Sequence, residues 1–138
     1  MSHLYSWMLY TSKFNCRRRL VLPEGNVTTL CYGELEIITG DNRGCISVWW
    51  IESGEQLQNF KVHDGAVTSI QVDATKAVSC GVDMVVAISD VIQGQVLQKL
   101  RGHNAPILAL AFDSTQITSI SSDGELRVWA WENNRSGV

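Results

Sequence analysis

Residues 106–130 (PILALAFDSTQITSISSDGELRVWA) decide the fold, because the same pattern occurs twice before them. Shifting the sequence by 40 and by 80 residues aligns them without a gap to residues 66–90 (AVTSIQVDATKAVSCGVDMVVAISD) and 26–50 (NVTTLCYGELEIITGDNRGCISVWW). Two of the columns that stay apolar are Val27, Val67 and Ile107, and Ile46, Val86 and Leu126. An exact spacing over three copies with conserved apolar columns indicates a repeat architecture.

Each copy divides into four short β-like runs. In the middle copy they cover residues 67–70, 77–80, 85–89 and 95–100, with turns near 73–76 and at 93–94. The runs are rich in β-branched residues and are bounded by Gly, Asp, Asn and Ser. No segment keeps a 3.6-residue apolar period long enough for a helix. Four strands in 40 residues predict an all-β fold of antiparallel β-propeller blades.

The same spacing predicts the domain organisation. Residues 6–10 align with 46–50, and residues 15–20 align with 55–60. We therefore expect a single repeat region over 1–138. Its parts are a partial blade at 1–22 (third and fourth strands), blades at 23–62 and 63–102, and a partial blade at 103–138 (first three strands). About three blades cannot close a ring. We expect a fragment of a longer propeller, or an arc completed by a second copy or by another repeat protein.

The last repeat carries the pair Gly102-His103 before its first strand and Trp129 on its third strand. In these features the chain resembles the WD-repeat family, which has Gly-His before the innermost strand and Trp-Asp at the end of the third. The dipeptide is not intact in the three copies, which read Trp49-Trp50, Ser89-Asp90 and Trp129-Ala130. The resemblance implies a propeller that serves as a non-catalytic protein–protein interaction scaffold.

The resemblance also implies a buried hydrogen-bond network in each repeat, made by a His, a Ser or Thr, an Asp and a Trp. Such groups are costly to bury unpaired, but they satisfy one another. The last repeat has all four members: His103, Ser119, Asp123 and Trp129. The middle repeat has His63, Ser79 and Asp83, with Ser89 in place of Trp. The first has Thr39 and Trp49, with Pro23 and Arg43 at the other positions. We therefore expect the last repeat to be the stiffest.

A hydrolytic triad is the alternative interpretation of His103, Ser119 and Asp123. These residue types recur in part at the same offsets in the other repeats, as structural residues do. Ser119 also lacks the nucleophile-elbow pattern, since its surroundings read ITSIS over 117–121. We expect a structural role, no enzymatic activity, no cofactor and no metal.

Composition limits the remaining classes. A hydrophobic content of 45% with 18% charged residues is typical of a globular chain. No apolar run reaches the roughly 18 residues that span a bilayer, and the N-terminus lacks signal-peptide features. We expect an intracellular protein, cytoplasmic or nuclear, without membrane insertion. Cys16, Cys31, Cys45 and Cys80 form no CxxC pair, so we expect reduced thiols. The basic run Arg17–Arg19 could bind phosphate or an acidic partner, but protection of an exposed strand edge is favoured.

The loops into each innermost strand and the turns between second and third strands share one face of a propeller. We expect this loop face to bind partner proteins or peptides. Its candidate residues are Asp41, Asn42, Arg43, Asp64, Met84 and Asn104. One alternative is the substrate-recognition part of a ubiquitin ligase of the F-box/WD type. An RNA- or lipid-binding propeller is disfavoured by the net charge of −3, and no small-molecule substrate is expected.

Overall fold

The described residues form three separate antiparallel sheets. The computed structural model describes residues 13–16, 19–21, 26–74 and 76–130. The first sheet, blade 1, contains β1 (Val27–Tyr32), β2 (Glu36–Asp41), β3 (Cys45–Trp50) and β4 (Gln56–Lys61). Blade 2 contains β5 (Val67–Val72), β6 (Lys76–Gly81), β7 (Val85–Asp90) and β8 (Gln95–Arg101). Blade 3 contains β9 (Ile107–Phe112), β10 (Gln116–Ser121) and β11 (Leu126–Ala130).

The strand order in every blade follows the chain order. All four runs expected in the middle repeat are present as β5 to β8, each extended by one or two residues. The pairing also repeats: Thr39 faces Leu30 across β1 and β2, and Ser79 faces Ile70 across β5 and β6. The first and second strands of all three blades show a register shift near the start of the first strand. The 40-residue spacing therefore corresponds to one blade.

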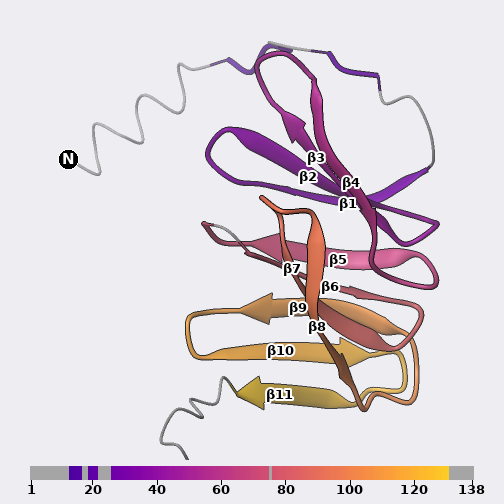
Figure 1. The fold of residues 1–138 in the computed structure, drawn as a ribbon. Coiled ribbons are helices and arrows are strands. Elements are labelled where there is room, and N and C mark those ends of the chain that lie inside the picture. Colours follow the sequence, from indigo (N-terminus) through magenta and orange to yellow (C-terminus); the bar gives the residue numbers. More distant parts are fainter. Residues whose placement is uncertain (1–12, 17–18, 22–25, 75, 131–138) are drawn as a thin grey trace, which may run out of the picture.

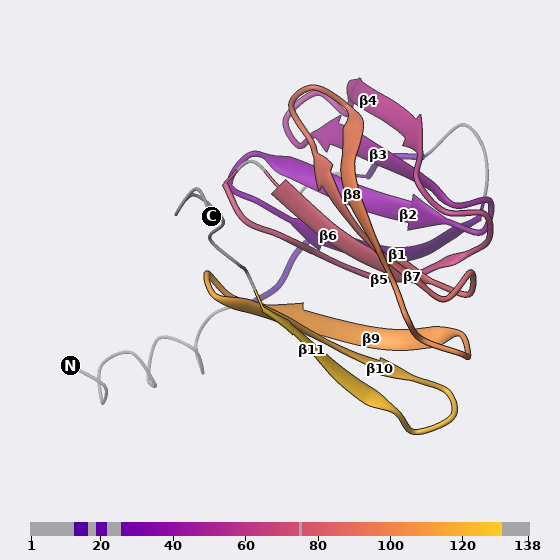
Figure 2. The ribbon, with the colours of Figure 1, turned by 60° about the horizontal axis from the view of Figure 1, so that its bottom comes forward.

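The blades stack face to face, with blade 2 between the other two (Figures 1 and 2). Blade 2 is consequently covered on both faces, and its central strands β6 and β7 are buried almost throughout. The core between blades 1 and 2 includes Ile38, Ile46, Val48, Ile70 and Ala87. The core between blades 2 and 3 includes Val78, Val86, Ile88, Leu110 and Ile117. Each blade thus presents one strand parity to the preceding blade and the other parity to the next.

Threonine hydroxyls also join the innermost strands of adjacent blades. Thr28 Oγ1 donates to the carbonyl of Val67 at 2.5 Å, and Thr68 Oγ1 donates to the carbonyl of Ile107 at 2.6 Å. The two threonines are 40 residues apart, so the contact repeats with the blades. Blade 3 has Leu108 in this position, which has no hydroxyl to donate.

The first partial blade is not observed in the described residues. The expected strand over 6–10 lies outside them. Of the expected outer strand over 15–20, residues 15, 16, 19 and 20 are described and are not in a strand, so that prediction is wrong for these residues. Arg19 is exposed, whereas Arg17 and Arg18 lie outside the described residues.

Candidate protein-binding surfaces

The most extensive side-chain network lies in blade 2. His63 Nδ1 lies 3.0 Å from Asp83 Oδ1, and His63 Nε2 lies 2.9 Å from Ser79 Oγ. The geometry fits an imidazole that donates from Nδ1 to the carboxylate and accepts the serine hydroxyl at Nε2. Asp83 also accepts the backbone N–H of Asp64 at 3.0 Å. The network links the loop before β5 to β6 and to the β6–β7 turn.

Burial lowers the pKa of His63 below its usual value of 6.5, and the neighbouring Asp83 carboxylate opposes this shift only in part. The imidazole is therefore neutral at pH 7, as the tautomer with the proton on Nδ1 requires. Ser89 stands where the family has Trp, and its hydroxyl is buried without a hydrogen-bond partner. Blade 2 thus keeps the His–Ser–Asp part of the network and has no indole donor.

In blade 3 the network differs from expectation at Asp123. Ser119 Oγ lies 2.7 Å from His103 Nε2 and accepts the Trp129 indole N–H at 2.9 Å. The Asp123 carboxylate instead accepts the hydroxyl of Ser121 and the backbone N–H of Glu125. His103 Nδ1 is left without a hydrogen bond. It lies 3.4 Å from Glu125 Oε1, but that carboxylate is held by Arg127 at 2.9 Å. The prediction that Asp123 completes the network is therefore wrong.

Residue 81 and its repeat equivalent, residue 121, explain this difference. Residue 81 is glycine, and a Cβ there would lie 2.7 Å from the Ala66 carbonyl oxygen and 3.3 Å from His63 Cγ. Gly81 therefore keeps the space beside the imidazole open for Asp83. In blade 3 this position is Ser121, whose hydroxyl binds the Asp123 carboxylate within its own turn. These hydrogen bonds lower the pKa of Asp123, which is an exposed residue.

Blade 1 has the shortest network. The Trp49 indole N–H donates to Thr39 Oγ1 at 2.9 Å. Arg43 is exposed at the position of Asp83, and its turn is capped by Asp41, whose carboxylate accepts the backbone N–H groups of Arg43 and Cys45, each at 2.9 Å. Pro23 lies outside the described residues. Thr39 and Trp49 therefore form a two-member contact.

A hydrolytic site is not supported by this geometry. In blade 3 the Asp123 carboxylate does not contact His103, so the imidazole has no orienting acid from that residue. In blade 2 the order Asp83–His63–Ser79 is present, but Ser79 and His63 are 0% exposed. Their hydrogen bonds are satisfied inside the blade, and an acyl substrate could not reach the hydroxyl.

The six residues expected on the loop face lie at one edge of the blades. Asp41 is the last residue of β2, Asn42 and Arg43 follow it in the β2–β3 turn, and Met84 lies in the β6–β7 turn. Asp64 and Asn104 lie in the loops that enter blades 2 and 3. All are exposed except Asp41, which is half-buried. Backbone hydrogen bonds connect the β2–β3 turn to the loop that enters blade 2. The Gly44 carbonyl accepts the N–H groups of Val62 and His63, at 2.9 and 3.0 Å.

Comparison with known proteins identifies the fold family. The family model described as the IP5P C–F β-propeller matches residues 27–129. The chain belongs to this β-propeller family. Its curated relatives carry WD repeats, and the chain is a partial WD-repeat propeller.

Two relatives illustrate the extent of the similarity. Apoptotic protease-activating factor 1 of Homo sapiens is 35% identical over 94 residues, which are 65% of this chain and 8% of that protein. WD repeat and HMG-box DNA-binding protein 1 of Homo sapiens is 42% identical over 59 residues, 41% of this chain and 5% of that protein. The chain thus spans less than a tenth of their lengths. Among solved structures, the computationally designed Ika4 protein is similar with a TM-score of 0.71 and 28% identity, over 77% of this chain and 66% of that one.

The cysteines of the WD-repeat blades form no disulfide. Burial raises the pKa of the Cys31 and Cys80 thiols to about 11. Both are therefore protonated at pH 7 and unreactive. Among the described residues, no group of His, Cys, Asp and Glu side chains is arranged to hold a metal ion. No helix in this part of the chain has the length and apolarity to cross a membrane.

Proposed function

We propose that this WD-repeat arc is a non-catalytic protein-interaction scaffold and that each of its two end faces binds a further blade. The end faces are the side of blade 3 that faces away from blade 2 and the side of blade 1 that faces away from blade 2. The observation that carries the proposal is the exposure of apolar columns there that are buried at both internal interfaces.

The blade 3 end face has the composition of a blade interface. Leu126 is 58% exposed, whereas Ile46 and Val86, which occupy the same column, are 0% exposed. Val128 is 55% exposed, and its equivalents Val48 and Ile88 are each 3% exposed. Large exposed apolar side chains gathered on one face are typical of an interaction surface.

The blade 1 end face exposes the apolar side chains that form the other half of a blade interface. Leu30 is 60% exposed, whereas Ile70 and Leu110 in the same column are 3% and 7% exposed. Val27 is likewise 41% exposed, and its equivalents Val67 and Ile107 are fully buried. Together, the two end faces supply both halves of the interface that already occurs twice in the chain.

The occupant that fits both faces is a second copy of this chain, docked head to tail so that blade 1 of one copy covers blade 3 of the other. Such a contact is heterologous and can close into a ring. The loop face is a second proposed binding surface. Its exposed aspartate, asparagine, arginine and methionine side chains suit a peptide of mixed polarity.

We place the protein inside the cell as part of this proposal. The absence of disulfides among its four cysteines is expected in a reducing compartment.

Sedimentation velocity of the purified chain at increasing concentration tests the end-face proposal. We expect self-association that Leu126→Asp and Leu30→Asp each abolish, because a buried carboxylate without a partner is costly. An equimolar mixture of the two variants should form a 1:1 dimer, since the blade 1 face is intact in the first and the blade 3 face is intact in the second.

Leu97→Asp is the matched control, because Leu97 is 49% exposed on the outer strand β8. It should associate like the unaltered chain. The head-to-tail contact would be excluded if the unaltered chain stayed monomeric at about 100 μM. It would also be excluded if the mixture of the two end-face variants stayed monomeric.

A further inference from the structure

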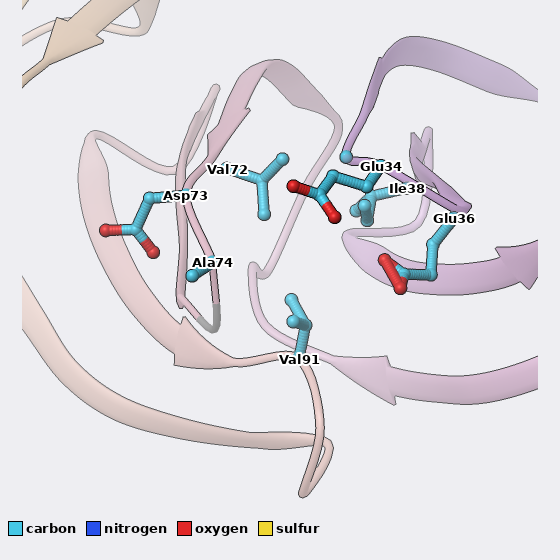
Figure 3. A pocket seen from close by; sticks show the side chains of 8 residues that line it. Glu34, Glu36, Ile38, Val72, Asp73, Ala74 and Val91 are labelled. Atoms are coloured by element: carbon cyan, nitrogen blue, oxygen red, sulfur yellow. The ribbon is translucent and has the colours of Figure 1, made fainter.

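A groove runs between blades 1 and 2 at the edge opposite the loop face. Its main hollow, of about 370 Å³, lies between the β1–β2 turn, the β5–β6 turn and the first residue of the β7–β8 turn (Figure 3). Ile38, Val72 and Val91 give it an apolar floor. A neighbouring hollow of about 220 Å³ shares Glu36, Ala74 and Val91 with it, and extends it to the exposed side chains of Leu57 and Ile92. The two hollows form one continuous groove.

The charged groups along this groove are all acidic. Glu34, Glu36 and Asp73 line the main hollow, and no Lys, Arg or His lines either hollow. Figure 3 shows the Glu34 carboxylate close to Val72, with Glu36 on the same side of the hollow. Within the described part of the chain, neither glutamate carboxylate makes an ion pair or hydrogen bond. The groove therefore combines an apolar floor with two unpaired carboxylates.

The equivalent groove between blades 2 and 3 differs in its charged residues and in the size of one floor residue. It has a volume of about 230 Å³ and is lined by Asp73, Lys76, Val78, Phe112 and Asp113, among others. Lys76 occupies the column of Glu36, so this groove contains its own cation beside two aspartates. Phe112 occupies the column of Val72 and fills more of the floor. The first groove has neither the cation nor the larger side chain.

We propose that the groove between blades 1 and 2 binds a basic peptide segment of a partner protein, in which a Lys or Arg lies next to apolar residues. The aliphatic stem of the basic side chain packs on Val72 and Val91, and its charged group pairs with Glu34 and Glu36. A flanking aliphatic side chain packs on Leu57 and Ile92. The partner's cation thereby takes the place that Lys76 holds in the next groove.

Acidic ligands are disfavoured at this groove, because a phosphate or a carboxylate would be desolvated next to like charges. The proposal uses neither end face and none of the loop-face residues. Its failure would therefore leave the head-to-tail contact untouched, and the reverse also holds.

Fluorescence anisotropy with a labelled basic peptide, Gly-Leu-Arg-Ile-Lys-Gly, tests the proposal on the full chain. The acidic peptide Gly-Leu-Glu-Ile-Glu-Gly is the matched ligand control. We expect saturable binding of the basic peptide that weakens with added salt, because the carboxylates are exposed to solvent. The acidic peptide should show no binding.

Two substitutions copy the next groove into this one. Glu36→Lys should weaken binding about five- to tenfold by replacing attraction with repulsion, and Val72→Phe should weaken it similarly by filling the floor. Both residue types already occur at these columns one blade later, so both variants should fold, as circular dichroism would verify. The double variant Leu97→Lys/Gln98→Lys, at two exposed positions of the outer strand β8, makes the same change in net charge and should alter binding less than about twofold.

Three results would overturn the assignment. One is no saturable binding of the basic peptide up to about 1 mM. Another is equal binding of the acidic peptide. The third is a loss of affinity in Leu97→Lys/Gln98→Lys as large as that in Glu36→Lys, because the change in net charge alone would then explain the weaker binding.

Discussion

At the residue scale, Gly44 and Gly124 occupy the same turn position in blades 1 and 3 and have left-handed backbones, with φ of +91° and +87°. Their surroundings differ. A Cβ on Gly44 would lie 1.9 Å from the His63 carbonyl oxygen, whereas a Cβ on Gly124 would meet nothing within 4 Å. Gly44 is packed against the loop into blade 2, and Gly124 has no blade beside it among the described residues.

Gly44→Ala should therefore destabilise the chain by at least about 2 kcal/mol, from backbone strain and overpacking. Gly124→Ala should cost only about 1 kcal/mol, from the left-handed backbone alone. Urea unfolding at a chain concentration that keeps the protein monomeric would measure both. Equal losses of unfolding free energy in the two variants would show that contact with the next blade does not determine how much an added Cβ destabilises this turn.

Met84 holds the third equivalent position with φ of +69°, the single non-glycine residue with positive φ in the described part of the chain. Its side chain is 40% exposed, so little packing is lost on truncation. Met84→Gly should raise the unfolding free energy by about 0.5–1 kcal/mol, because glycine relieves the left-handed strain.

Val82, two residues before Met84, is a control for this substitution. It is similarly exposed, but its φ is not positive. Val82→Gly should lower the unfolding free energy, since it adds chain flexibility without relieving strain. A fall in thermal midpoint for Met84→Gly would contradict the strain at this position.

At the element scale, the turn between second and third strands determines whether a blade ties its Asp to its His. Blade 2 does so because Gly81 leaves space beside His63, and blade 3 does not because Ser121 binds the Asp123 carboxylate. The more extensive His–Asp linkage therefore lies in the blade that lacks Trp. The sequence-based expectation that the last repeat is the stiffest is not supported by the hydrogen bonds.

Exchanging the two residues tests this explanation. Gly81→Ser should destabilise blade 2 by about 1–3 kcal/mol, because it displaces Asp83 and leaves the buried His63 Nδ1 unsatisfied. Hydrogen exchange measured by NMR should then show faster opening of the amides around residues 63 and 79.

Ser121→Gly is the reciprocal variant. It should let Asp123 reach His103, which would appear as a protected Nδ1–H resonance of that imidazole. Unchanged exchange in Gly81→Ser together with an unchanged His103 resonance in Ser121→Gly would rule out residues 81 and 121 as the cause.

At the scale of the whole molecule, burial of the His63 imidazole gives the stability of the chain a dependence on pH. Burial holds the pKa of His63 below 6.5 in the folded chain, so the unfolded chain binds the proton more readily. The contribution of His63 is therefore fully present above about pH 6.5 and is lost as the pH falls through the folded pKa.

NMR titration of the imidazole resonances should give a midpoint for His63 below 6.5. The unfolding free energy should decrease as the pH falls from 7 toward that midpoint. His63→Gln should show a weaker pH dependence over the same interval. A His63 midpoint above 6.5 would reverse the predicted sign.

The 40-residue repeat of the sequence determined the blades, their strands and the phase of each strand. The reason is that apolar alternation and turn residues act locally, within a few residues of one another. The columns of Thr39, Ser79 and Ser119, and of Trp49 and Trp129, also follow from this spacing. The same alignment contained the paired threonines Thr28 and Thr68, and could have indicated their repeated role.

The tertiary structure alone decided which polar groups meet. Whether Asp83 or Asp123 reaches an imidazole depends on the presence of a Cβ at residue 81 or 121. The repeat spacing carries no information about the space beside the imidazole. The groove between blades 1 and 2 combines acidic and apolar side chains from the β1–β2 and β5–β6 turns, which lie about 40 residues apart in the chain. Such contacts depend on distances between separate blades, whereas sequence periodicity describes one blade at a time.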